Sequence, residues 1–223
     1  MTRIFIAIPS VGVCDTRFAI SLASLKKPPG TAIASSPRSI TDVARNSLFE
    51  QALKFRYDYV FFLDDDMVLD AGLLEALKKT MDEDASIAVL APLAFRRHPP
   101  FLPCVFKHRR DHYYDPLDLD AVEPGLVDVD ALHFAATLVR SSALAKIPPP
   151  RFEFIHVKNE TIGEDIALSS KLQQSGARLV CDTRLEALHI SLPPLVGRDA
   201  YEAARRAKGQ VPESDLAIRV ESR

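Results

Sequence analysis

The sequence predicts an α/β fold, a single domain in which helices flank a central, mostly parallel sheet. The first observation is alternation: short apolar runs typical of buried strands are separated by segments with helical periodicity. These runs occupy residues 4–8, 31–34, 59–63 and 87–90. The second observation is that their connections are short, which favours right-handed βαβ units and parallel strands. A chain of 223 residues, 47% of them hydrophobic, can bury one sizeable core.

Three helices are expected between these strands. The first spans residues 16–25 and is stopped by Pro28-Pro29. The second follows residues 39–42, whose Ser-x-x-Asp pattern resembles a capping box, and continues to about Arg56. The third spans residues 71–81. Each helix thus separates two strand segments, as a parallel sheet requires.

The alternation loosens after Pro92. Residues 127–139 have the composition of strands, although residues 131–138 could also be helical. A helix over residues 165–175 is expected to end at Gly176, because glycine is the usual residue just past a helix C-terminus.

Two further strands are expected, one at residues 178–181 and one ending near Ile190. The domain is therefore assigned to residues 1–192, with its first half at about residues 1–95 and its second at 96–192. Residues 193–223 are interpreted as a polar tail with one helix around residues 199–208.

The charge balance excludes some partners. A formal net charge of −2 gives no electrostatic reason to expect binding to nucleic acid or to an anionic membrane. One local basic cluster, Lys107-His108-Arg109-Arg110, is more typical of a solvated loop than of a binding patch. No stretch is long and apolar enough to predict a membrane span.

The cysteines and the N-terminus bear on the compartment. Cys14, Cys104 and Cys181 lie far apart without metal-ligand spacing, and an odd number without a framework fits a reducing compartment. The first residues lead directly into a strand and contain no apolar signal core. We therefore expect a cytoplasmic protein, and peripheral association with a membrane stays open.

Three consecutive acids, Asp64, Asp65 and Asp66, follow the apolar run at residues 59–63 directly. Carboxylates at the carboxyl end of a buried strand repel one another and lose hydration, so they favour a compensating hard cation. In parallel α/β sheets ligands also bind at this end of the strands. The alternative is a solvated acidic turn.

Phosphate-binding loops are absent from the sequence. There is no G-x-x-x-x-G-K-[ST] and no G-x-G-x-x-G among the eight glycines, and neither G-x-S-x-G nor H-E-x-x-H occurs. If the protein handles phosphates, it must therefore do so through a metal and side chains, which the aspartate cluster could provide.

Two other groups of residues could belong to a site. Arg45 and Asn46 share a helix face with Asp42, and the arginine there could meet an anionic ligand or pair with an aspartate. The alternative is a surface i,i+3 pair between Asp42 and Arg45. The acids Glu164 and Asp165 open a predicted helix, where they could equally act as partners of the helix dipole.

His189 closes an apolar strand. A lone histidine in that setting is more often a core or rim residue than a ligand.

Together these motifs resemble the GT-A glycosyltransferases, especially the family 2-like enzymes. The resemblance rests on Ala44-Arg45-Asn46 in a helix, on the strand and acidic D-x-D triplet at residues 57–66, and on the "E-D" motif with its helix and next strand at residues 163–168 and 176–179. His189 falls where many GT-A enzymes have a metal-binding histidine. The matching order covers about residues 3 to 190.

The resemblance implies a GT-A, Rossmann-like fold and a metal-dependent transfer of a hexose-type sugar, with inversion, from a nucleotide-diphosphate sugar to an acceptor hydroxyl. The acceptor could be a glycan, a lipid or a small molecule. Mixed oxygen and imidazole ligands favour Mn²⁺, or else Mg²⁺. The implied metal ligands are Asp66, His189 and Asp64. The implied donor-binding residues are Pro9, Ser10, Arg45, Asp64 and Asp65. Asp165 is the implied catalytic base, with Glu164 beside it.

The sequence departs from the family at the end of the second strand. The nucleoside-binding acid usual there is replaced by Ala34-Ser35-Ser36-Pro37, so the nucleotide stays open. One alternative is a sugar-phosphate nucleotidyltransferase, but those enzymes carry a glycine-rich, basic loop where this chain has residues 9–13 with one glycine and no basic residue. Another is a non-catalytic nucleotide-sugar binder, which would keep residues 64–66 but have no need of Asp165.

Overall fold

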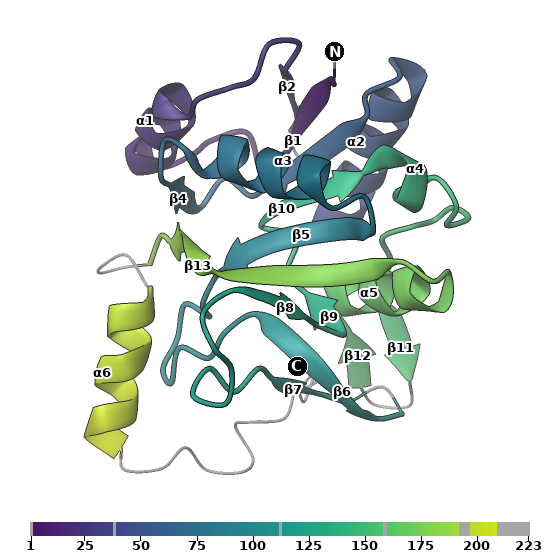
Figure 1. Cartoon of the computed structure of the whole chain (residues 1–223). Helices are drawn as coiled ribbons and strands as arrows, with labels where there is room; N and C mark the ends of the chain where they lie inside the picture. Colours follow the sequence, from purple (N-terminus) through teal and green to yellow (C-terminus); the bar gives the residue numbers. More distant parts are fainter. Residues whose placement is uncertain (1, 38, 112, 158–159, 192–196, 209–223) are drawn as a thin grey trace.

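A central sheet organises the computed structural model, which describes residues 2–37, 39–111, 113–157, 160–191 and 197–208 (Figure 1). Within these residues the sheet has eight strands in the order β2-β1-β3-β10-β5-β13-β4, and β8 also pairs with β13. Five of them run in one direction: β1 (Ile4–Ser10), β2 (Ala32–Pro37), β3 (Tyr59–Leu63), β5 (Ile87–Leu93) and β13 (Arg178–His189). The predicted mixed α/β class with a mostly parallel sheet is confirmed.

Three strands of the sheet run in the opposite direction: β4 (Met67–Leu69), β8 (Leu126–Asp128) and β10 (Ala136–Arg140). Strand β10 lies in the middle of the sheet, between β3 and β5. The apolar stretch at residues 127–139 is therefore strand material, and the helical alternative for residues 131–138 is wrong. A short strand, β9 (Ala131–Leu132), also lies in this stretch and pairs outside the main sheet.

Helices cover both faces of the sheet. They are α1 (Thr16–Ser24), α2 (Thr41–Lys54), α3 (Leu73–Glu83), α4 (Ser141–Leu144) and α5 (Glu164–Gln174). Alternate side chains of a strand point to opposite faces, so Ile6 and Phe61 join one apolar cluster with α1 and α3, while Phe5 and Phe62 join another with α2 and α5. Burial on both faces explains why these strands are continuous apolar runs.

The observed helix ends agree in part with those predicted from the sequence. Gly176 has a φ of 80° just past α5, which is the left-handed conformation expected after a helix C-terminus. The predicted capping box before α2 does not form, because the N-cap residue is Ile40 and no side chain caps the helix there. This N-terminus instead places Asp42 in the first turn, where its charge suits the helix dipole.

Two small sheets lie outside the central one. Strands β6 (Val105–Arg110) and β7 (Tyr113–Pro116) form a hairpin that is extended by β9. Strands β11 (Ile155–Val157) and β12 (Glu160–Ile162) form the second. In the described part of the chain, no helix is both long and apolar enough to cross a membrane.

The last described helix, α6 (Arg198–Lys208), lies beyond the end of β13 (yellow in Figure 1). Its Tyr201 is buried in the same apolar cluster as Phe5, and its ring lies 5.4 Å from that of Phe95. Part of the segment interpreted as a polar tail therefore packs onto the core. The boundary predicted at residue 192 falls outside the described residues and stays a prediction, as does the remainder of the tail beyond Lys208.

We expect Tyr201→Ala to lower the free energy of unfolding by about 3 kcal/mol, because it removes a buried aromatic side chain from the core. Urea denaturation of the full chain measures this loss. The matched control is Arg206→Ala on the same helix, whose side chain is 76% exposed and should cost less than about 0.5 kcal/mol. Equal, small effects of the two changes would mean that α6 does not stabilise the domain.

Candidate functional site

The three aspartates form the turn that joins β3 to β4 at the carboxyl edge of the sheet. The Asp64 N–H donates to the carbonyl of Ala135, just before β10, at 2.8 Å. The carbonyl of Asp66 accepts from the N–H of Ile190, just after β13, also at 2.8 Å. The backbone of the turn is thus fixed at both ends to neighbouring segments of the sheet.

A buried arginine collects three carboxylates at this edge. The Arg45 side chain is only 2% exposed. Its Nη2 lies 2.9 Å and 3.0 Å from the two carboxylate oxygens of Asp64. Its Nη1 donates to Oε1 of Glu164 at 2.8 Å and also to Oδ1 of Asp165. We call these four residues the Arg45 cluster.

The Arg45 cluster decides between the two interpretations of Arg45. The surface pair with Asp42 is wrong, because the guanidinium is buried and bound to other acids. Instead, the cluster joins two motifs that are far apart in the sequence, the acidic triplet and the acids that open α5. The predicted role of Arg45 at the donor would have to be indirect, since its terminal nitrogens are already bound to carboxylates.

Arg45 is one cation facing three acids, so the largely buried cluster carries excess negative charge when all three are ionised. Burial raises the pKa of Asp64 to about 6, against the attraction of Arg45. Burial and the neighbouring Asp165 charge raise the pKa of Glu164 to about 7. Burial lowers the pKa of Arg45, but the three carboxylates outweigh it and the net shift is upward. The cluster therefore holds a proton readily near neutral pH.

Asp66, two residues after Asp64 in the same turn, lies beside His189. Nε2 of His189 lies 3.5 Å from Oδ2 of Asp66, and Nδ1 of His189 lies 2.8 Å from the carbonyl oxygen of Phe95. A carbonyl only accepts, so Nδ1 carries a proton, and in the neutral ring Nε2 presents its lone pair toward Asp66. Oδ1 of Asp66 is buried and lacks a hydrogen-bond partner among the described residues.

The charges of this pair support each other. Burial raises the pKa of Asp66, but the protonated His189 ring, which donates from Nε2 and carries a positive charge, and the charge of Arg97 outweigh it, so the net shift is downward. Burial lowers the pKa of His189, but the hydrogen bond and charge of Asp66 give a net upward shift.

The donor set fits a divalent cation in part. Asp66 offers an unpartnered carboxylate oxygen and His189 an imidazole nitrogen whose ring is oriented by a carbonyl, as is usual for metal-bound histidines. Across the residues that the structure describes, no group of three or more metal-binding side chains gathers. Asp64, the third predicted ligand, has both oxygens on Arg45. A cation here would therefore need further ligands from a bound molecule and water.

The remaining predicted residues lie at the same edge. Pro9 and Ser10 end β1, which pairs with β3, and they lie opposite Ser36 and Pro37 of β2. Ser10 Oγ accepts from the N–H of Gly12 at 3.0 Å. Asp65 is partly exposed, but its Oδ2 is buried and has no partner within the described chain. None of these three residues contacts the Arg45 cluster by a hydrogen bond that the structure records.

Asn46 has a structural role. Its side-chain nitrogen donates to the carbonyl of Phe152 at 2.7 Å, and its oxygen accepts from the N–H of Arg151 at 3.0 Å. These bonds hold the segment whose Phe152 ring lies 5.5 Å from the Arg45 guanidinium. Asn46 therefore holds in place the segment that packs against Arg45, and its side chain is used for that role rather than for binding a ligand.

Two residues near the site were not predicted from the sequence. Arg97 approaches Asp66 from the loop after β5, with Nη1 3.1 Å from Oδ2. His133 is 6% exposed, with Nε2 3.0 Å from the carbonyl oxygen of Pro92 and Nδ1 without a partner among the described residues; burial lowers its pKa to about 4. His133 could have been noticed as an isolated polar residue in an apolar run, whereas nothing in the sequence marks Arg97.

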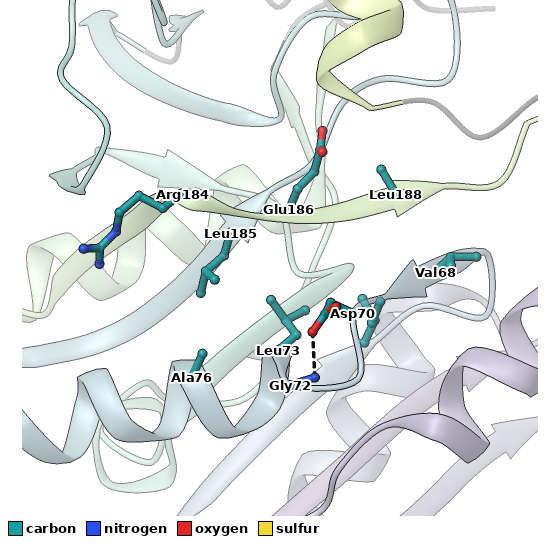
Figure 2. Close-up of a pocket in the computed structure, with 10 residues that line it drawn as sticks. Val68, Asp70, Gly72, Leu73, Ala76, Arg184, Leu185, Glu186 and Leu188 are labelled. Atoms are coloured by element: carbon teal, nitrogen blue, oxygen red, sulfur yellow. Dashed lines mark hydrogen bonds between the residues drawn. The ribbon is translucent and has the colours of Figure 1, made fainter.

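A cavity of about 700 Å³ lies between the end of β13 on one side and β4 and α3 on the other (Figure 2). Its apolar lining includes Leu73, Leu185 and Leu188, and its polar lining includes Arg184 and Glu186. No residue predicted from the sequence as part of a site lines this cavity. The candidate site is therefore the edge formed by the Arg45 cluster and the Asp66–His189 pair.

Comparisons with known proteins describe the fold. No family model and no curated protein matches this chain. Among solved structures, the chain is similar to A197 from STIV, known from a crystal structure, with a TM-score of 0.59 and 20% sequence identity over 85% of this chain and 86% of that one. At this identity the likeness shows the mixed α/β fold alone.

The Arg45 cluster predicts a pH-dependent effect of Glu164→Gln. A carboxyl whose pKa rises from 4.5 to about 7 on folding keeps a proton that the unfolded chain releases, so its contribution to stability falls as pH rises through this range. Glutamine resembles the protonated acid but does not titrate, so the variant does not lose this stability as the pH rises. We therefore expect the free energy of unfolding of the variant, relative to that of wild type, to rise by about 2 kcal/mol as the pH goes from 5 to 8.

Urea denaturation at the two pH values measures this gain. The matched control is Glu75→Gln on the exposed side of α3, which should follow wild type at both pH values. A Glu164→Gln variant that loses stability relative to wild type as pH rises would mean that Glu164 is stabilised as a carboxylate by Arg45, contrary to the direction of its pKa.

Proposed function

We propose that this chain is a metal-dependent glycosyltransferase of the GT-A type, family 2-like, which moves a sugar from a nucleotide-diphosphate sugar to an acceptor hydroxyl. The observation that carries the proposal is the meeting of Asp66 and His189. These residues are far apart in the sequence, yet their side chains lie 3.5 Å apart at the carboxyl edge of the sheet, with one buried carboxylate oxygen unpartnered. Ligands of α/β sheets bind at this edge.

The chemistry explains why such a pair is useful. When a glycosidic bond to a nucleoside diphosphate breaks, negative charge grows on the leaving phosphate. A bound Mn²⁺ or Mg²⁺ would stabilise that charge as a Lewis acid. In this chain Oδ1 of Asp66 and Nε2 of His189 would hold the cation, and the carbonyl of Phe95 keeps the imidazole in the required orientation.

The acids that open α5 are the candidates for the base. The attacking acceptor hydroxyl must lose its proton, and a carboxylate on the acceptor side can take it. We assign this role to Asp165, with Glu164 as the second acid of the cluster. Asp64 holds Arg45 in place rather than serving as a ligand, and Ser10, Pro9 and Asp65 are proposed to line the donor.

A specific observation favours a second candidate, a non-catalytic nucleotide-sugar binder. Oδ1 of Asp165 accepts from Arg45, and Oδ2 accepts from the N–H of Phe134 at 3.2 Å. Both oxygens are thus engaged, and a base needs one lone pair directed at the acceptor. In a binder these bonds would be the whole role of Asp165, which would position α5 against the Arg45 cluster.

The partners of the proposed enzyme are a nucleotide-sugar donor and an acceptor that stays open among glycans, lipids and small molecules. A cytoplasmic location, with or without peripheral contact to a membrane, belongs to this proposal. No nucleic-acid partner is proposed, since the net charge of −2 offers none of the attraction that such binding uses.

We expect Asp66→Ala to weaken Mn²⁺-dependent donor binding by at least about 100-fold, since loss of even an outer partner of a metal ligand can cost that much. A thermal-shift screen of nucleotide sugars with and without Mn²⁺ measures binding, because a ligand of the folded state raises the midpoint. Asp115→Ala is the matched control, as Asp115 is also paired with an arginine at the surface. Metal-dependent stabilisation that survives in Asp66→Ala would rule out the assigned ligand.

Asp165→Asn distinguishes the enzyme from the binder. We expect transfer to fall by about 10²- to 10⁴-fold, the usual contribution of a general base, while donor affinity stays near wild type. Product formation with Mn²⁺ and the donor found in the screen measures the rate, and calorimetry measures affinity. Glu164→Gln is the comparison, since it changes the neighbouring acid of the same cluster. Loss of donor affinity in Asp165→Asn, or a retained anomeric configuration in the product, would remove the base role.

A further inference from the structure

Arg97 contacts the same carboxylate of Asp66 that would hold a bound cation. Its Nη1 lies 3.1 Å from Oδ2 of Asp66, the same oxygen that Nε2 of His189 approaches at 3.5 Å. The Arg97 side chain is 52% exposed, while that of Asp66 is 29% exposed. A guanidinium that is half in water can leave such a contact at little cost, because exposed ion pairs contribute about 0–1 kcal/mol.

The position of Arg97 is fixed by the loop that also orients His189. This loop is closed by a β-bridge between Phe95 and Pro103 and by a bond from the Arg96 N–H to the carbonyl of Leu102 at 2.9 Å. Phe95 at its base accepts from His189, and the carbonyl of Arg97 accepts from the hydroxyl of Ser191 at 3.4 Å. The loop therefore carries both the group that aligns the imidazole and the charge that neutralises Asp66.

We propose that Arg97 is the resident counter-cation of Asp66 and that it moves to the diphosphate of the donor when a divalent cation binds to Asp66 and His189. This inference rests on the proposed function and adds a diphosphate-binding residue to that site. A divalent cation on Oδ1 and the guanidinium on Oδ2 would share one carboxylate and repel each other, so a bound cation would weaken the contact between Asp66 and Arg97. The diphosphate brings in negative charge beside the metal and gives the displaced guanidinium a new partner.

Arginine suits both positions. Its planar fork of donors can bind a carboxylate and also bind two phosphate oxygens in parallel, which an ammonium cannot do. Arg45, the other arginine of the site, cannot take this role because its side chain is 2% exposed and bound by three acids. The exposed arginine thus exchanges partners, while the buried one does not.

The test measures two affinities in Arg97→Gln. With Mn²⁺ as the sole added ligand, followed by electron paramagnetic resonance of the free ion, affinity should rise about threefold, because a competitor for Asp66 is gone. With saturating Mn²⁺, the affinity for the nucleoside diphosphate that binds wild type most tightly, chosen from UDP, GDP, ADP and CDP by calorimetry, should fall about tenfold. The two changes have opposite signs, which a general loss of structure would not produce.

Two variants complete the design. Arg97→Lys keeps the charge and loses the fork, so Mn²⁺ affinity should stay near wild type while diphosphate affinity falls. Arg109→Gln is the matched control, since Arg109 is 47% exposed and lies 3.5 Å from Asp115 on the β6–β7 hairpin, and it should change neither affinity.

The outcomes separate this inference from the function on which it rests. If wild type binds neither Mn²⁺ nor any of the four diphosphates, the proposed function fails and this inference fails with it. If wild type binds both and Arg97→Gln changes neither affinity, or lowers both, only the role of Arg97 is overturned.

Discussion

The rest of the site depends on one buried cation. Arg45 has lost nearly all its water, and a guanidinium in that state must be matched by anions. It obtains them from Asp64 at the end of β3 and from the two acids that open α5, so one side chain of α2 fixes how three elements meet. Removing Arg45 would leave these largely buried carboxylates without their cation, which costs far more than losing a surface ion pair. The Arg45 cluster therefore links α2, β3 and α5, and it also forms one side of the candidate site.

The two acidic centres at this edge are neutralised in different ways. In the Arg45 cluster the cation is permanent, and the acids adapt through raised pKa values of Asp64 and Glu164. At Asp66 the partners are His189 and a half-exposed Arg97, and the pKa of Asp66 is lowered. The first centre keeps its cation and adapts by taking up a proton, whereas the second would, by our proposal, exchange one cation for another. A site that binds a metal with its ligand and keeps its shape needs both properties.

Much of this arrangement could be predicted from the sequence, because it follows from local patterns. Apolar runs mark β1, β3 and β5, and acids after such a run must lie at the carboxyl edge. The direction of β10 could not be predicted, since a buried strand has the same composition whether it runs parallel or antiparallel. The partners of Arg45 were equally hidden, because Glu164 and Asp165 reach it only through the packing of α5. Arg97 sits in an irregular loop, where no periodicity indicates a direction for its side chain.

Under the proposed function, the choice between an enzyme and a binder depends on the freedom of Asp165. Its two oxygens are held by Arg45 and by the N–H of Phe134, and these two bonds differ in what their loss would cost. The N–H of Phe134 has Asp165 as its one recorded acceptor among the described residues, whereas Arg45 would keep Asp64 and Glu164 if Asp165 left it. Oδ1 of Asp165, which accepts from Arg45, is therefore the oxygen that could instead accept a proton from an acceptor hydroxyl. A donor that brings its own negative charge to this edge would favour that release, because it raises the repulsion among three carboxylates around a single cation.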